Sequence, residues 1–120
     1  MGDSYKDLIA WRKAMQLVTD IYRVTQGFPR GELYGLTNQL RRAAVSVPSN
    51  IAEGQARYSA KEFRHFLSLS RGSLVEAETQ LIIGQNLGYL PVEQGQTLLD
   101  QTAELGRVLN GLIASIKQAA

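Results

Sequence analysis

The chain has 120 residues, of which 44% are hydrophobic and 20% are charged, and its formal net charge is +2. These values predict one globular domain over residues 1–120 and leave no comfortable room for a second one. The absence of cysteine excludes thiol catalysis, zinc ribbons and iron–sulfur clusters, and it agrees with a reducing cytoplasm. The single histidine, His65, nearly excludes catalytic triads.

The N-terminal stretch contains no recognisable targeting segment. Its apolar run, from Leu8 to Trp11, is too short for a signal peptide or a membrane span. We therefore expect a cytoplasmic protein without a membrane partner.

The charges are distributed unevenly along the chain. Residues 1–71 contain 11 Lys or Arg and 6 Asp or Glu, whereas residues 72–106 contain five acidic residues and no basic one. Such a division predicts either a molecule with one basic face or internal pairing between the two parts. The sequence alone leaves both possibilities open.

Four segments have the apolar spacing of helices, and none alternates convincingly like a strand. They cover about residues 7–26, 32–54, 59–87 and 91–118. Ser59 and Glu62 have the spacing of a capping box, which predicts the start of the third helix. Gly27, Gly54 and Gly88 are the predicted helix ends, and Pro91 suits the first turn of the fourth helix.

Each predicted helix has an apolar stripe along one side. The stripes consist of Trp11, Met15, Val18, Tyr22 and Thr25 in the first helix; Leu36, Leu40, Ala43, Val47 and Ile51 in the second; Phe63, Leu67, Ser70, Leu74, Ala77, Leu81 and Gly84 in the third; and Leu98, Thr102, Leu105, Leu109, Leu112 and Ile116 in the fourth.

The lengths of these helices and of their connections predict the fold class. Helices of about 20 to 28 residues are about 30 to 40 Å long, and short connections make neighbouring helices antiparallel. We therefore predict an all-α protein, an up-down-up-down antiparallel four-helix bundle. Pro48 is expected to bend the second helix, where Ser46, Ser49 and Asn50 can bind the backbone groups that it frees.

No motif in the chain supports an enzyme. Glu62 and His65 have the Glu-x-x-His spacing of di-iron bundles, but such a site needs a second motif and two more carboxylates, and the chain has only one histidine. No phosphate loop, dinucleotide-binding glycine pattern or nucleophile elbow is present. We predict no catalytic residues, no metal site, no cofactor and no small-molecule substrate.

A basic cluster is the most informative feature of the charge pattern. Arg57, Lys61 and Arg64 share a face if helical order extends back through Arg57, and Arg71 continues their row one heptad later. Arginine suits bidentate contact with phosphate, and equally with carboxylate. The predicted nucleic-acid-binding residues are Arg41, Arg57, Lys61, Arg64 and Arg71. The alternative is a solvated face with salt bridges to the acidic part of the chain.

Four segments carry a resemblance to a known family. Residues 11–15 read WRKAM, residues 34–46 YGLTNQLRRAAVS, residues 47–54 VPSNIAEG, and residues 72–81 GSLVEAETQL. Over about residues 5–115 the chain resembles the bacterial four-helix bundle proteins of the 23S rRNA intervening-sequence (S23) family. This resemblance implies a ring-shaped homopentamer of four-helix protomers without catalytic activity.

The family is also similar in fold to the accessory protein of diversity-generating retroelements, a basic pentamer that engages a reverse transcriptase and its RNA. That likeness implies RNA or a reverse-transcriptase-like nucleoprotein as the partner. The matching motif residues, which we interpret as structural, are Arg42, Pro48, Asn50, Glu53, Gly54, Gly72, Ser73 and Glu76. We expect Arg42 to pair with Glu76 across helices.

Together these arguments predict a non-enzymatic, cytoplasmic homopentamer that binds RNA or a nucleoprotein through basic residues. Five copies of a charge of +2 give a ring of +10, so assembly multiplies a modest charge. The alternative is a protein–protein interaction scaffold with no role in nucleic-acid binding.

Overall fold

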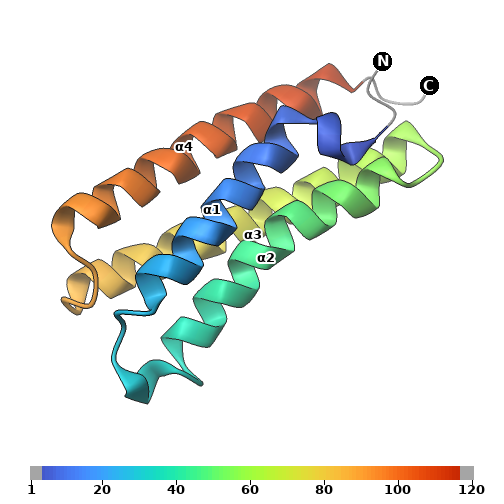
Figure 1. The fold of residues 1–120 in the computed structure, drawn as a ribbon. Coiled ribbons are helices and arrows are strands. Elements are labelled where there is room, and N and C mark those ends of the chain that lie inside the picture. Colours follow the sequence, from blue (N-terminus) through green and yellow to red (C-terminus); the bar gives the residue numbers. More distant parts are fainter. Residues whose placement is uncertain (1–3, 117–120) are drawn as a thin grey trace.

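The computed structural model describes residues 4–116, and these contain four α-helices and no strand. Helix α1 spans Ile9–Thr25, α2 Leu36–Gln55, α3 Ala60–Asn86 and α4 Val92–Ser115 (Figure 1). Two 3-10 turns, η1 (Tyr5–Asp7) and η2 (Arg30–Glu32), precede α1 and α2. The predicted all-helical fold is confirmed, although residues 117–118 of the fourth predicted helix lie outside the described part.

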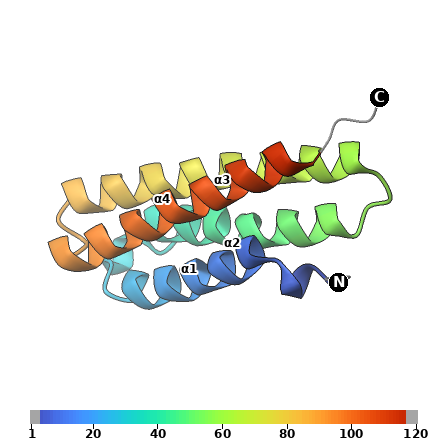
Figure 2. The same cartoon turned by 90° about the horizontal axis from the view of Figure 1, so that it is seen from above.

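The four helices pack around one core, with α1 beside α2 and α3 beside α4 (Figure 2). Figure 1 shows the start of α1, the α2–α3 turn and the last turn of α4 at the same end of the molecule. The fold is elongated, and its Cα atoms extend over 49 × 25 × 22 Å. Within residues 4–116, no helix has the length and apolarity that crossing a bilayer requires.

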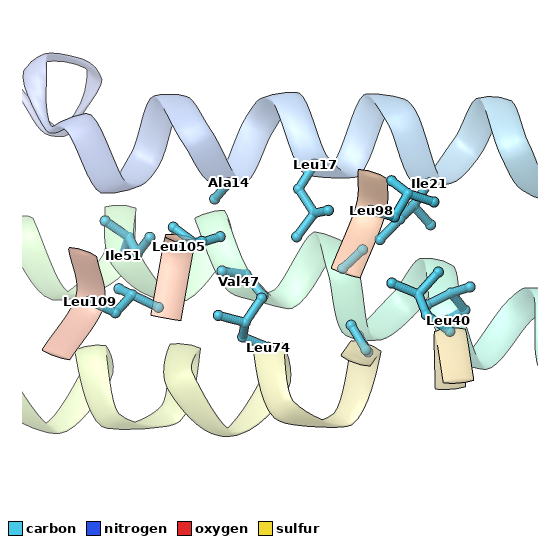
Figure 3. Close-up of a cluster of buried hydrophobic side chains, with 14 of the residues drawn as sticks. Ala14, Leu17, Ile21, Leu40, Val47, Ile51, Leu74, Leu98, Leu105 and Leu109 are labelled. Carbon is cyan, nitrogen blue, oxygen red and sulfur yellow. The ribbon is translucent and has the colours of Figure 1, made fainter. Parts of the chain in front are cut away.

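The core contains the predicted stripes of α2, α3 and α4. Leucines from different helices, among them Leu40, Leu74 and Leu105, are buried along the interior of the bundle (Figure 3). All five predicted positions of α2 are buried, and in α3 all but the half-buried Phe63 are buried. The three-and-four spacing therefore identifies the inward faces of these helices.

In α1, by contrast, the predicted stripe is wrong at every position except Thr25, which is buried. The buried residues of this helix are Ala10, Ala14, Leu17, Ile21 and Thr25. Met15 and Tyr22 are 40% and 41% exposed, and Trp11 and Val18 are only half-buried. Alanine at two inward positions lets α1 approach the other helices closely, so its larger apolar residues are displaced to the flank.

The predicted boundary signals at the two ends of α3 are confirmed, Gly88 in full and the pair Ser59 and Glu62 in part. Gly88 follows α3 with a φ of +76°, and the Tyr89 N–H donates to the Gly84 carbonyl at 2.9 Å, which is the pattern of a glycine cap. The Ser59 hydroxyl accepts a hydrogen bond from the Glu62 N–H at 3.1 Å. The return bond from the Glu62 side chain is not formed, so the capping box is only half present.

Gly27 follows the end of α1 as predicted, directly after the C-cap residue Gln26, but without the positive φ of a glycine cap. Gly54 does not end α2, because the helix continues to Gln55. A Cβ on Gly54 would lie 2.7 Å from the Phe66 Cβ and 3.0 Å from a ring carbon of Phe63. Glycine at this position therefore permits the close approach of α2 and α3.

Pro48 is accommodated within α2, which continues through it. The Ser49 hydroxyl donates to the Val45 carbonyl and the Asn50 amide donates to the Ser46 carbonyl, each at 2.8 Å. The predicted side chains thus bind backbone carbonyls here, but not that of Ala44, from which proline removes the usual donor.

At the opposite end of the molecule from the α2–α3 turn, Glu32 joins two connections. Its Oε1 accepts from the Leu36 N–H at 3.1 Å at the start of α2, and its Oε2 accepts from the Tyr89 hydroxyl at 2.9 Å. This hydrogen bond, assisted by burial and by the negative charge of Glu32, raises the pKa of Tyr89 above its ordinary value of 10.

We predict that Gly54→Ala lowers the free energy of unfolding by about 1 to 3 kcal/mol, because the new methyl group forces α2 and α3 apart. Gly111→Ala is the matched control. No atom lies within 4 Å of a Cβ at this position, so alanine should stabilise α4 by up to about 1 kcal/mol. Denaturant unfolding measures both values, and equal effects of the two substitutions would contradict the close-approach role of Gly54.

We predict that Tyr89 ionises later than the exposed tyrosines when absorbance is followed against pH. Because the fold raises the pKa of Tyr89, its stabilising effect is complete below pH 10 and is lost as the pH rises through the raised pKa. Tyr89→Phe should remove the late-ionising component and make stability less dependent on pH above 10. Loss of an early-ionising component instead would contradict this assignment.

Candidate nucleic-acid interface

The structure converts the uneven charge along the chain into a difference between the two ends of the molecule. We divide each helix at its midpoint and define the basic end as residues 4–17, 46–73 and 104–116, which contain eight Lys or Arg and four Asp or Glu. The remaining described residues, 18–45 and 74–103, contain four Lys or Arg and six Asp or Glu. The basic end therefore has a net charge of +4 and the other end −2.

Internal pairing does not neutralise this difference. Four ion pairs form within residues 4–116, and three of them join residues close in sequence. Only the bond from Lys13 to Glu104, at 3.0 Å, joins the basic first part of the chain to the acidic part that follows. The alternative of extensive salt bridges between the two parts is therefore not observed among the described residues.

Arg57 lies in the turn between α2 and α3. One of its terminal nitrogens lies 2.6 Å from a carboxylate oxygen of Glu53, and its guanidinium lies 4.7 Å from the centre of the Phe66 ring. The side chain remains 41% exposed. Glu53 and Phe66 thus hold Arg57 at the basic end with part of its guanidinium open to a ligand.

Lys61, Arg64 and Arg71 project from α3. Lys61 and Arg71 are exposed and form no ion pair with any described residue. Arg64 is half-buried, and its Nε is buried without a hydrogen-bond partner in the described part of the chain. These three cations, unlike Arg57, have no carboxylate partner in residues 4–116.

The predicted single row of basic residues is wrong at Arg57. The chain leaves helical order after Gln55 and re-enters it at Ala60, so helical spacing does not align Arg57 with Lys61. Arg57 stacks on Phe66, whose Cβ lies close to Gly54 of α2. Lys61, Arg64 and Arg71 keep the helical spacing of the predicted row on α3, and Arg57 lies apart from that row in the turn before the helix.

Arg41 lies apart from the other predicted residues, in the first half of α2 at the other end of the molecule. Its Nε donates to the Thr25 hydroxyl at 2.8 Å, and a terminal nitrogen donates to the Tyr22 carbonyl at 3.4 Å. Its guanidinium also lies 4.6 Å from the centre of the Tyr22 ring. Arg41 thus binds the last turn of α1, which indicates a structural role.

Tyr58 is a further residue of the basic end, and the sequence prediction left it out of the site. Its side chain is fully exposed at the α2–α3 turn, between Arg57 and the start of α3. An exposed aromatic ring among cations can stack on an unpaired base. The sequence showed that Tyr58 follows Arg57 directly, but it could not show that the Tyr58 side chain is exposed.

Most of the family-motif residues gather where α2 contacts α3. The hydroxyls of Ser46 and Ser73 are hydrogen-bonded at 2.8 Å, and the Asn50 amide donates to the Ser46 hydroxyl at 2.9 Å. These contacts agree with the structural roles expected for Asn50 and Ser73. Gly72 differs from them, because it is exposed and no atom lies within 4 Å of a Cβ at its position.

The expected ion pair between Arg42 and Glu76 is not observed. Both side chains are exposed and line one groove between α2 and α3, but their charged atoms do not come within the 4.0 Å of a salt bridge. The positions of Arg42 on α2 and Glu76 on α3 place both residues at the same groove, but the guanidinium and the carboxylate do not form an ion pair.

In the described range, residues 4–116, no three His, Asp or Glu side chains gather closely enough to hold a metal ion. Glu62 uses its backbone in the cap of α3, and the His65 ring lies edge-on to Phe66, with 5.5 Å between their centres.

Comparisons with known proteins agree with this fold. A family model described as 23S rRNA-intervening sequence protein matches residues 6–111. A crystal structure from Bacteroides thetaiotaomicron VPI-5482, described as a protein with unknown function from the S23 ribosomal protein family, is similar with a TM-score of 0.83. Its sequence is 20% identical, and the match covers 92% of this chain and 99% of that one. Among curated proteins, none matches this chain.

We predict that Arg41→Met lowers the free energy of unfolding by about 2 kcal/mol, because it removes two charge-assisted hydrogen bonds to α1 and the stack on Tyr22. Arg42→Met, at the adjacent exposed position, is the matched control and should change stability by no more than about 0.5 kcal/mol. Thermal or denaturant unfolding measures both effects. A larger loss of stability from Arg42→Met than from Arg41→Met would indicate that Arg42 pairs with Glu76 after all.

Proposed function

The chain belongs to the 23S rRNA-intervening sequence protein family, and we propose that it is a non-enzymatic protein of the cytoplasm that binds RNA or a nucleoprotein through its basic end. The printed descriptions of the matching family and of the similar structure name no catalytic activity. The similar structure belongs to a protein of unknown function, so the proposal depends on the charges and geometry of this chain.

The observation that carries the proposal is the set of cations at the basic end that the protein leaves open. Lys61 and Arg71 on α3 are exposed without an ion pair among the described residues, and Arg57 in the α2–α3 turn remains 41% exposed. Cations without internal partners can neutralise phosphates and release the counterions that surround nucleic acid. Basic residues already paired with carboxylates would gain much less from the same contact.

The surroundings of these cations favour RNA with unpaired or irregular regions. Tyr58 is exposed at the same turn and can stack on a base that is not paired. Phosphate contacts carry no sequence information, so recognition by such a surface depends on RNA shape. Arg41 is not part of the proposed interface, because its donors are used within the protein.

The proposal treats the four helices as an up-down-up-down bundle that forms one subunit of a ring-shaped homopentamer. A ring multiplies the basic ends, so weak contacts by single subunits add up to stronger binding. The elongated shape and the uneven ends of the protomer support an arrangement in which all basic ends lie on one side of the ring.

A second candidate function is a protein–protein scaffold that binds no nucleic acid. The exposed apolar side chains on α3, including Leu69 and Val75, favour this alternative. Protein and RNA partners are distinguished by the salt dependence of binding and by the charge-reversal variants below.

We predict that Lys61→Glu combined with Arg71→Glu lowers the affinity for a structured ribosomal RNA fragment at least about tenfold at 50 mM salt. The substitutions replace two phosphate-binding cations by anions, and the slope of log affinity against log salt should decrease by about two. Fluorescence anisotropy at 50 and 200 mM salt measures both quantities. Both side chains are exposed, so the fold should be unchanged.

The matched control is Arg23→Glu combined with Arg30→Glu, which changes the net charge equally at the other end of the molecule. This variant should retain most of the wild-type affinity. Equal losses in the two variants would show that only net charge matters, and no binding by the wild type at low salt would exclude the RNA proposal and leave the scaffold.

A further inference from the structure

Opposite charges line the groove between α2 and α3 without pairing. Arg42 of α2 and Glu76 of α3 are both exposed there, and neither forms an ion pair with any residue between 4 and 116. The other residues that line the groove are Asn38, Gln39, Ala43, Ser46 and Gln80. We call this surface the α2–α3 groove. Because its two charges are not paired with each other, a ligand does not have to break a salt bridge before it binds them.

Contacts between the two helices place these charges at the same level along the molecule. Helices α2 and α3 lie side by side (Figure 1), and the hydroxyls of Ser46 and Ser73 are hydrogen-bonded at 2.8 Å. Arg42 precedes Ser46 by about one helical turn, and Glu76 follows Ser73 by about one turn. Both line the same groove, so they lie on the same side of the serine contact.

Gln80 is a third polar residue of the groove, and part of it has no partner. The residue is only 8% exposed, and its Oε1 is buried without a hydrogen-bond partner in the described part of the chain. A buried acceptor without a donor lowers the stability of a folded protein, and such groups are rare in native structures. A donor that enters the groove from outside would satisfy this oxygen, so Gln80 indicates that the groove has a ligand.

The three side chains together specify the chemistry of that ligand. A guanidinium such as that of Arg42 binds a carboxylate through two parallel hydrogen bonds. The Glu76 carboxylate and the Gln80 Oε1 are both acceptors, and an ammonium group has three donors, enough for the two of them. A molecule with one carboxylate and one ammonium group therefore satisfies all three side chains at once.

We propose that the α2–α3 groove binds a free polar amino acid, with its carboxylate on Arg42 and its ammonium group shared between Glu76 and Gln80. The amino acid is a ligand here and not a substrate. The groove has a volume of about 450 Å³, within the range of small-molecule sites. Asn38 and Gln39 are exposed at the same groove, and their amides can bind a polar side chain of the ligand.

The charge balance favours a zwitterion over a nucleotide or another multiply charged anion. One cation and one anion line the groove, and both belong to the end of the molecule with a net charge of −2. A phosphate group would meet a single arginine there and would be repelled by Glu76. Lys61 and Arg71, which we assign to RNA, do not line the groove, so this inference goes beyond the proposed function and does not depend on it.

The direct test is isothermal titration calorimetry of the full chain with L-serine, L-asparagine and L-glutamine, with L-leucine as the apolar comparison. We expect saturable binding of at least one polar amino acid and weaker binding of L-leucine, whose side chain cannot use the amides of the groove. Absence of saturable binding by all three polar amino acids up to about 10 mM would overturn the proposal.

Modified ligands test the two charges separately. The N-acetyl derivative of the tightest-binding amino acid lacks the ammonium group, and its carboxamide derivative lacks the carboxylate. Each modification should weaken binding at least about tenfold, because each removes charge-assisted hydrogen bonds. Unchanged affinity of either derivative would contradict the recognition of a zwitterion.

Substitutions in the groove test the assignment of each residue. Arg42→Gln and Glu76→Gln should each weaken binding at least about tenfold, and both side chains are exposed, so the fold should be unchanged. Arg30→Gln and Glu93→Gln are the matched controls, because they make the same changes at exposed positions outside the groove. Groove variants that bind as tightly as these controls would overturn the site.

The carboxamide derivative adds a sharper test of Arg42. Because this derivative lacks the group that Arg42 recognises, Arg42→Gln and the wild type should bind it with equal affinity. A further loss of affinity in the variant would show that Arg42 does not act on the carboxylate.

Gln80→Met separates a ligand-binding role from a structural one. The substitution replaces the unsatisfied amide by an apolar side chain of similar shape, so the free protein should have a higher Tm. The same variant should bind the amino acid at least about fivefold more weakly, because the ammonium group loses one acceptor. A lower Tm, or an unchanged affinity, would overturn the role of Gln80.

The variants also separate this inference from the proposed function. Lys61→Glu combined with Arg71→Glu should bind the amino acid as the wild type does, and Arg42→Gln combined with Glu76→Gln should bind the ribosomal RNA fragment as the wild type does. Loss of both ligands in either double variant would contradict the independence of the two sites.

Discussion

The close contact between α2 and α3 is the constraint on which the rest of the structure depends. Gly54 lets the two backbones approach, and the hydroxyl of Ser70 binds a backbone carbonyl of α2 near the middle of the contact. This packing fixes the register of the two helices, and the register places the start of α3 at one end of the molecule. The cations at that end and the outward side of α3 take their positions from it.

Most of the fold could be predicted from the sequence because the three-and-four stripes of α2, α3 and α4 coincide with the buried faces of these helices. In α2, for example, Leu40, Val47 and Ile51 are both the periodic residues and the buried ones. In α1 two stripes compete, and the sequence favours the larger side chains. Ala10 and Ala14 are the buried residues because their small side chains let α1 pack closely against the other helices. Alanine is common at both buried and exposed helix positions, so the sequence alone did not indicate that these two are buried.

The candidate site was less predictable than the fold. The basic residues could be identified individually, but their arrangement depends on where helical order stops. Arg57 lies within the four-residue turn between α2 and α3, so it does not share the helical spacing of the basic residues on α3. Arg41 illustrates the second difficulty. Its charge resembles that of Lys61 in the sequence, yet a neighbouring helix end uses its donors. Contacts between side chains on different helices depend on the register and the rotation of one helix relative to the other, and local sequence patterns do not encode either.

The unlike charges at the two ends of the molecule have a consequence for its encounters with other molecules. An elongated particle with a positive end and a negative end has an electric dipole along its long axis. The field of a polyanion rotates such a particle before the two touch, so the first contact is made by the positive end. Encounters are then oriented as well as accelerated, and dissolved salt weakens this orientation because it screens the field beyond about 10 Å.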